Sequence, residues 1–176
     1  MKQIVSFLSV LLLLSSTGIG HADRAVYTLG SGDKIRIIVF DEEDLSGEFE
    51  VSGEGALSLP LIGTIPVKAK TLREIEIAIQ EKLLDGFLKN PRVNIEVLNY
   101  RPFYILGEVF KPGSYPYVIG MTVLNAVALG GGFSARAKKD NITIIRATDP
   151  RQLPQTVSTE TIVLPGDVVR VEERFF

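Results

Sequence analysis

The sequence of 176 residues contains no cysteine and no tryptophan, and its single histidine is His21. Without cysteine the chain can form no disulfide bond, no thiolate nucleophile and no cysteine-ligated zinc site. His21 lies in an N-terminal segment that we expect to be removed, so the mature chain would also lack a histidine general base or metal ligand. These absences exclude the commonest catalytic and metal-binding chemistries.

Motifs for catalysis and cofactor binding are missing as well. The glycines at 130–132 follow a predicted helix instead of preceding it, so they do not form a phosphate-binding helix start. There is no Gly-x-Ser-x-Gly motif, and the acidic stretch 41–44 lacks the alternating spacing of a calcium loop, which favours a solvated turn. No carboxylate lies in an apolar run of the kind that raises the pKa of a general acid. We therefore predict no catalytic residue, no metal site, no cofactor and no enzyme activity.

Neither sign of charge dominates the chain, which has 19 basic and 21 acidic residues. The N-terminus combines basic Lys2, an apolar run from 4 to 14, a polar break at 15–17 and the small residue Ala22. This pattern predicts a secretory signal peptide over residues 1–22, because the apolar run is far shorter than the ~20 residues that span a bilayer. A retained membrane anchor is the alternative. Cleavage would leave 18 basic and 21 acidic residues without a clustered basic face, so we predict no nucleic-acid partner.

Hydrophobic periodicity predicts a first unit of several strands and one helix. The β-rich run 34–40 follows a Gly-Asp turn. Thr71 precedes Glu74 by three residues, which predicts a capping box and a helix that ends at Asp85-Gly86. Its apolar positions share one helical face. Apolar residues at 93, 95 and 97 alternate with polar ones and predict a half-buried strand, and further short strands are predicted at 49–51, 57–59 and 61–67.

A second unit begins with two predicted strands, 104–106 and 115–119, connected through Lys111-Pro112-Gly113. Thr122 is the expected cap of a helix over 123–129, with a left-handed C-cap among the following glycines. A hairpin that leads into one short helix is how a β-grasp fold begins. Downstream, the sequence predicts a basic turn at 136–139, a strand at 142–144, a looser segment over 148–158 and a last strand at 167–171.

The same turn-into-strand signature occurs at both ends of the mature chain. Gly32-Asp33 leads into Lys34-Ile35, and Gly166-Asp167 leads into Val168-Val169. Two interpretations remain open: common turn chemistry, or a structural arrangement in which the first and last strands lie near one another and tie the two units together.

Several motifs resemble those of bacterial polysaccharide export proteins. The Gly107-Glu108-Val109 step, Lys111-Pro112-Gly113 and the helix 122–133 are similar to the soluble-ligand-binding β-grasp (SLBB) module, and 27–35 with 59–63 are similar to the polysaccharide-export domain that precedes it. The resemblance implies an α+β fold with a signal peptide (1–22), a polysaccharide-export domain (23–101) and one SLBB-type β-grasp domain with a closing C-terminal strand (102–176). The motif residues with a structural role are Gly30, Gly32, Asp33, Gly63, Gly107, Pro112, Gly113, Gly166 and Asp167.

The resemblance implies a periplasmic component of exopolysaccharide or capsule export, associated with the outer membrane, that forms a homo-oligomeric ring and guides the secreted polysaccharide to an outer-membrane channel. The implied partners are an inner-membrane co-polymerase or synthase complex and a separate outer-membrane β-barrel. The chain departs from larger relatives in two places. It has no lipoprotein cysteine, which argues against a lipid anchor. Too few residues follow Val171 for the ~20-residue helix with which those relatives cross the outer membrane, so a separate barrel is expected.

Aromatic residues gather around the predicted domain junction and hairpin. Ring faces and tyrosine hydroxyls can contact sugars, but subunit interfaces also select tyrosine. The sequence leaves both roles open for Tyr100, Tyr104, Tyr115 and Tyr117. Two other functions are weighed: a monomeric periplasmic β-grasp module that binds a soluble oligosaccharide, and an envelope glycan hydrolase that uses two carboxylates.

Overall fold

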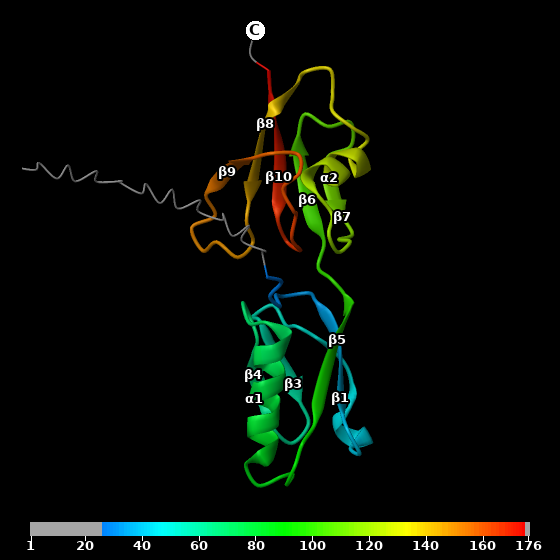
Figure 1. Ribbon diagram of the computed structural model, residues 1–176, viewed down its shortest axis with the longest axis vertical. Helices are drawn as coiled ribbons and strands as arrows, with labels where there is room; N and C mark the ends of the chain where they lie inside the picture. Colours follow the sequence, from blue (N-terminus) through cyan, green and yellow to red (C-terminus); the bar gives the residue numbers. More distant parts are fainter. Residues whose placement is uncertain (1–25, 175–176) are drawn as a thin grey trace, which may run out of the picture.

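The computed structural model describes residues 26–174, which form two α+β units that follow one another along the long axis (Figure 1). The predicted signal peptide, residues 1–22, lies outside the described residues. Within the described range neither helix has the length and apolar character that a membrane span requires.

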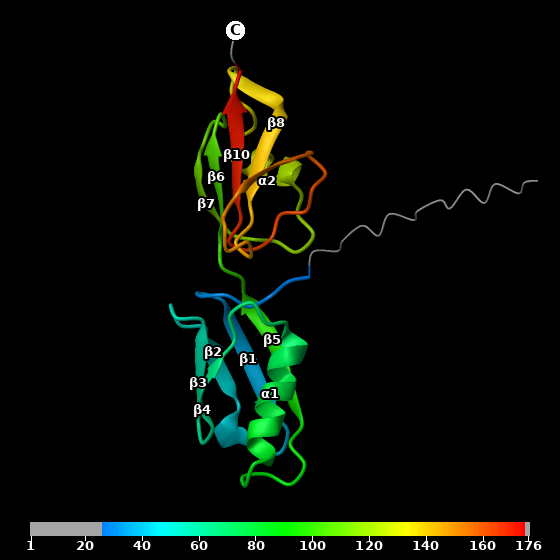
Figure 2. The ribbon, with the colours of Figure 1, turned by 90° about the vertical axis from the view of Figure 1, so that its left-hand side faces the viewer.

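The first unit packs one helix against a small antiparallel sheet. Strand β1 (Lys34–Val39) lies between β2 (Gly47–Glu50) and β5 (Val93–Asn99), and a separate hairpin pairs β3 (Ala56–Leu59) with β4 (Gly63–Pro66). The 3-10 turn η1 (Glu43–Leu45) contains the second half of the acidic stretch 41–44. Figure 2 shows helix α1 (Leu72–Leu84) alongside β1 and β5.

Helix α1 forms where the sequence predicts it. The Thr71 side chain accepts a hydrogen bond from the Glu74 N–H, and the Glu74 carboxylate accepts one from the Thr71 N–H, so the predicted capping box is confirmed. Its inward residues Ile75, Ile79 and Leu83 are fully buried in the core of the first unit.

The second unit is a five-stranded sheet with one short helix on one face. The strand order is β7 (Gly113–Tyr115), β6 (Phe103–Gly107), β10 (Val168–Glu173), β8 (Ala137–Ile145) and β9 (Pro154–Val157), and β6 and β10 are its parallel pair. Helix α2 (Val123–Leu129) has the bounds expected from its Thr122 cap. Its buried residues pack with Phe103 and Ile105 of β6, whereas Tyr104 and Leu106 point to the opposite, exposed face of the sheet.

Gly107 is required by the parallel pair at the centre of this sheet. Its φ is +83°, and a Cβ atom at this position would lie 2.1 Å from the carbonyl oxygen of Val171 in β10. Only glycine combines this conformation with such a close approach of two backbones. The family motif Gly107-Glu108-Val109 therefore marks the contact between the hairpin and the last strand.

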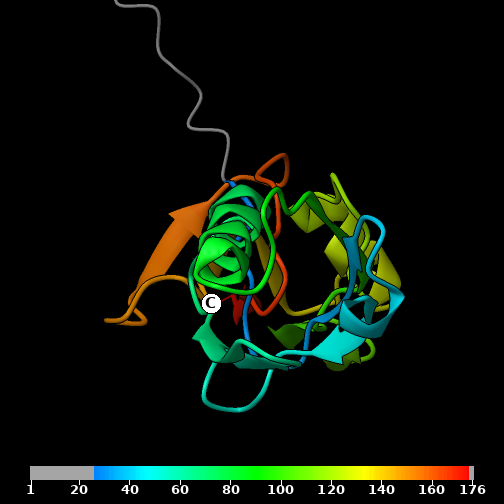
Figure 3. The same cartoon turned by 90° about the horizontal axis from the view of Figure 1, so that it is seen from below.

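Three details of the second unit differ from the sequence prediction. The segment 154–157 is strand β9, not part of a looser segment, and its Pro154 is tolerated because it is the first residue of an edge strand. Seen along the long axis, β9 projects to one side (Figure 3). The strand predicted over 115–119 ends at Tyr115, since Pro116 has no N–H to continue the ladder. The predicted basic turn 136–139 is mostly the start of β8.

Candidate functional site

The two Gly-Asp turns each bury a carboxylate completely. Asp33 is 0% exposed, and its Oδ2 accepts hydrogen bonds from the Gly30 N–H (2.8 Å) and the Tyr27 hydroxyl (2.7 Å). Arg101 completes the site, because its backbone N–H donates to Asp33 Oδ1 (2.7 Å) and its guanidinium forms an ion pair with Oδ2. Burial and the bond to Asp33 raise the pKa of Tyr27 far above its usual range.

Asp167 repeats this arrangement in the second unit. It is also 0% exposed, and its Oδ2 accepts from the Leu164 N–H (2.8 Å), three residues earlier, as Asp33 accepts from Gly30. The Arg146 guanidinium donates a hydrogen bond to the same oxygen (2.6 Å), and the backbone N–H of the following residue, Ala147, donates to Oδ1 (3.0 Å). Arg101 follows β5, which pairs antiparallel with β1, the strand after the first turn. Arg146 follows β8, which pairs antiparallel with β10, the strand after the second turn.

Arg101 lies between the two turns and joins the units. Its side chain is 14% exposed. A Cβ atom on Gly30 would lie 2.7 Å from the Arg101 Cζ, and one on Gly166 would lie 2.8 Å from its Nε. The Gly166 N–H also donates to the carbonyl of Pro102 (3.0 Å). Both Gly-Asp turns therefore contact the connecting segment, whereas the strands that follow them, β1 and β10, lie in separate sheets.

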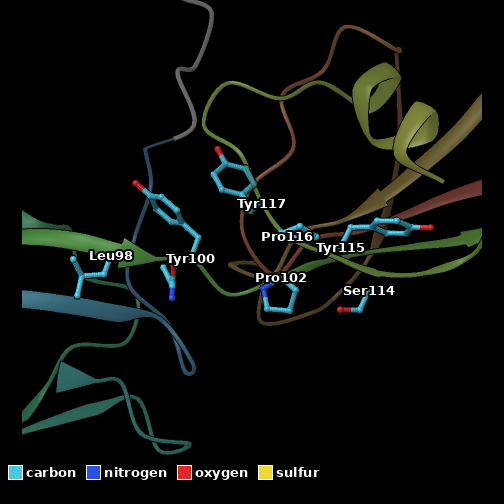
Figure 4. A pocket seen from close by; sticks show the side chains of 8 residues that line it. Leu98, Tyr100, Pro102, Ser114, Tyr115, Pro116 and Tyr117 are labelled. Carbon is cyan, nitrogen blue, oxygen red and sulfur yellow. The ribbon is translucent and has the colours of Figure 1, made fainter. Parts of the chain in front are cut away.

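A cleft of about 430 Å³ opens at this joint, and we call it the tyrosine cleft (Figure 4). Tyr100 packs edge-to-face against Tyr27 (centroids 4.9 Å apart) and against Tyr117 (5.2 Å). None of the eight lining residues is charged. They come from the end of β5, the connecting segment and the β7 region: Leu98, Asn99, Tyr100, Pro102, Ser114, Tyr115, Pro116 and Tyr117.

The structure separates the four tyrosines that the sequence grouped together. Tyr100, Tyr115 and Tyr117 line the tyrosine cleft, whereas Tyr104 is 43% exposed on the open face of the sheet and is not a lining residue. The Tyr115 hydroxyl donates to the Lys111 carbonyl (2.6 Å), which fixes this ring in place. Burial raises the pKa of Tyr100 and Tyr117, so both hydroxyls stay protonated near neutral pH and can donate and accept hydrogen bonds.

The remaining motif residues lie in turns and loops. Gly63 opens strand β4 with a φ of +68°, and Gly113 opens β7. Pro112 precedes it in a loop where Lys111 donates its N–H to the Gly130 carbonyl (2.7 Å). Gly32 and Gly166 have φ values of +88° and +84°, the left-handed conformation that each Gly-Asp turn needs.

A second cleft, of about 780 Å³, lies on the joint around Arg101 and, unlike the tyrosine cleft, has charged residues in its lining. It is bordered by Thr28, Lys68 and Asp149 among others. Sequence reasoning identified neither this cleft nor the roles of Arg101, Arg146 and Tyr27. The available signal was the arginine directly before Pro102, at the end of a predicted strand, but its partner Asp33 is 68 positions away.

Helix α2 and the segment before it carry an exposed apolar surface. Val118, Ile119 and Leu129 are exposed and border a shallow hollow of about 490 Å³ together with Met121. Leu124 is also exposed, and it lies on the same helix face as Ala128, another residue that lines the hollow. The segment 112–135 contains no charged residue. We call this surface the apolar α2 face.

Comparison with known families assigns both units. Residues 21–98 match the polysaccharide biosynthesis/export protein family, and residues 102–154 match the SLBB domain. The chain is thus a two-domain α+β protein in which a polysaccharide-export domain precedes a β-grasp domain. It belongs to the bacterial polysaccharide export proteins, a family with a role in transport, and the resemblance seen in the sequence is confirmed.

Three relatives illustrate the similarity. The chain is 39% identical to the exopolysaccharide production protein ExoF of Rhizobium meliloti over 137 residues, 71% of this chain and 32% of ExoF. It is 29% identical to the EPS I polysaccharide export outer membrane protein EpsA of Ralstonia nicotianae, with 87% of this chain and 49% of EpsA covered. The polysialic acid transport protein KpsD of Escherichia coli is 26% identical over 60% of this chain and 19% of KpsD. The chain therefore spans less than half the length of these relatives.

Proposed function

We propose that this protein is a periplasmic subunit of a polysaccharide export machinery, in which it forms a homo-oligomeric ring that guides the polymer to an outer-membrane channel. The names of the relatives, which refer to exopolysaccharide production, polysaccharide export and polysialic acid transport, support the export role. The expected partners are the secreted polysaccharide, an inner-membrane co-polymerase or synthase complex, and a separate outer-membrane channel protein. We also propose a domain boundary between residues 101 and 102.

The apolar α2 face is the observation that supports assembly into a ring. It is uncharged, as the cores of subunit interfaces are, and it lies on the side of the sheet opposite to Tyr104 and Leu106. Two different surfaces on opposite sides of one domain favour a head-to-tail contact, and repeated head-to-tail contacts close into a ring when the rotation allows it. The occupant of the apolar α2 face is therefore a second copy of this chain.

Leu124 and Leu84 provide a matched test of this assembly. Both are exposed helical leucines, at 52% and 53%, but only Leu124 lies on the apolar α2 face. In native mass spectrometry we expect the wild-type protein to be a closed oligomer, Leu124→Glu to be a monomer with unchanged circular dichroism, and Leu84→Glu to keep the wild-type mass. A monomeric wild type, or equal effects of both substitutions, would refute the ring.

The export role itself is tested in the cell. Deletion of the gene should abolish polymer secretion, and the Leu124→Glu variant should fail to restore it while Leu84→Glu restores it. The second candidate function is a monomeric periplasmic module that binds a soluble oligosaccharide. It is favoured by the tyrosine cleft, because three tyrosine rings and the neutral polar side chains of Asn99 and Ser114 line it. A monomeric wild type together with normal secretion after deletion would select this alternative.

A further inference from the structure

We propose that the tyrosine cleft is a binding site for an uncharged stretch of the exported polysaccharide, in which pyranose rings pack against the rings of Tyr100 and Tyr117. The identity of the ligand rests on the proposed function. The cleft itself is a feature of one subunit, at the joint between the two domains. Figure 4 shows Tyr100 and Tyr117 close together, with Pro102, Pro116 and Tyr115 continuing along the cleft.

The lining residues have the chemistry that a sugar face requires. A pyranose presents C–H groups on its flat faces and hydroxyls around its rim, so it combines with aromatic rings and with neutral hydrogen-bonding groups. The tyrosine cleft offers the rings of Tyr100, Tyr115 and Tyr117 and, beside them, the amide of Asn99 and the hydroxyl of Ser114. Its volume of about 430 Å³ falls within the range of roughly 300–1,000 Å³ typical of small-ligand sites.

The tyrosine rings are held before a ligand arrives. Tyr100 lies edge-to-face between Tyr27 and Tyr117, and the Tyr27 hydroxyl is anchored on buried Asp33. Little side-chain entropy is therefore lost when a sugar binds, because the rings are already in position. The same contacts place the cleft at the joint, where the orientation of the two domains sets its width.

The absence of charge in the lining selects the class of ligand. None of the eight lining residues can form an ion pair with a uronic acid or a sialic acid, so a neutral segment is preferred over an acidic one. A second protein chain fits this cleft less well than it fits the apolar α2 face, whose exposed side chains are mostly aliphatic. The two surfaces therefore have separate occupants, a sugar segment and another subunit.

The test titrates the purified protein, in its native assembly, with cellohexaose as a neutral oligosaccharide and with trigalacturonate as an acidic one. Binding is measured by saturation-transfer NMR and calorimetry. We expect saturable binding of cellohexaose and weaker binding of trigalacturonate. Tyr117→Ala should weaken cellohexaose binding about tenfold, and Tyr117→Phe, which keeps the ring, should retain most of it. Ser114→Trp should also weaken binding, by filling the cleft without removing a ring contact.

Phe87→Ala is the control, because Phe87 is a half-exposed aromatic residue in the segment between α1 and β5, at the far end of the first unit (Figure 1). No binding of cellohexaose, tighter binding of trigalacturonate, or equal weakening by Tyr117→Ala and Phe87→Ala would overturn the proposal. A change in oligomer mass in Tyr117→Ala, with binding unchanged, would also overturn it and identify a subunit contact. If Tyr117→Ala does not fold, Ser114→Trp decides. Failure of binding in an intact ring would leave the export function standing.

Discussion

Asp33 and Asp167 occupy the same position in two copies of one turn, and each is fully buried with an arginine from the strand-end of its own unit. In both copies one carboxylate oxygen accepts the N–H three residues earlier and a guanidinium, while the other accepts a backbone N–H from beyond the neighbouring strand. Within the described residues only the first copy has a tyrosine hydroxyl, that of Tyr27, on its carboxylate, and only the first copy takes its arginine from the connection between the units. Arg101 belongs to the connecting segment, so the first turn also fixes the joint between the domains.

Loss of the Asp33 carboxylate should destabilise the protein strongly. Asp33→Ala removes the carboxylate that pairs with the guanidinium of Arg101 and accepts the N–H of Gly30, at a cost of about 3–5 kcal/mol in the free energy of unfolding. Urea unfolding followed by circular dichroism measures this cost. Glu48→Ala is the control, because the pair of Glu48 with Arg36 is solvent-exposed and its loss should change stability little.

A double substitution checks that the Asp33–Arg101 pair acts as a unit. Because the two side chains are in direct contact, Asp33→Ala combined with Arg101→Ala should cost clearly less than the sum of the single changes. Simple additivity would mean that the two groups act independently of one another.

Gly30 should tolerate no side chain, although its backbone conformation would allow one. A Cβ atom on Gly30 would lie 2.7 Å from the Arg101 guanidinium and push it away from Asp33, which predicts a loss of about 1–3 kcal/mol for Gly30→Ala. Gly53→Ala is the matched control, since neither glycine has a positive φ and no atom lies within 4 Å of a Cβ on Gly53. Thermal unfolding of both variants measures the loss of stability. Small-angle X-ray scattering of the whole protein measures any change in the arrangement of the two domains. Equal behaviour of the two variants would exclude this role of Gly30.

Local signals in the sequence predicted the elements that depend on neighbouring residues. Thr71 with Glu74 and Thr122 with the following apolar run identified both helices, because a cap and a periodic face lie within a few residues of each other. Strand β9 was missed, since its residues carry a proline and few large apolar side chains and are ordered mainly by pairing with β8.

Only part of the candidate site could be predicted, because several of its contacts join residues that are far apart in the sequence. The Gly-Asp turns are visible as local motifs, but Arg101 reaches Asp33 across 68 positions and no periodicity encodes that contact. The sequence also placed four tyrosines near the junction. Residue alternation along β6 turns Tyr104 to the open face of the sheet, and only the tertiary structure brings Tyr100 beside Tyr117.

The phenol of Tyr27 should contribute to the stability limit at high pH. Its pKa is raised in the folded protein, first by burial and then by the hydrogen bond to Asp33, whereas an unfolded tyrosine titrates near ~10. A raised pKa means that the folded state favours the protonated phenol. The stabilisation is therefore complete below about pH 10 and is lost as the pH rises from there toward the folded-state pKa.

Comparison of wild type with Tyr27→Phe isolates this contribution, because the other tyrosines and the lysines titrate in both proteins. At pH 8 we expect the wild type to be more stable by about 1.5–3 kcal/mol, the value of a hydrogen bond to a charged partner. Between pH 10 and 11 the wild type should lose stability faster than Tyr27→Phe, so that the difference measured by urea unfolding becomes smaller. Parallel pH profiles would show that the Tyr27 hydroxyl does not hold its proton against Asp33. The anchoring of Tyr27, and through it of Tyr100, on the buried carboxylate would then be wrong.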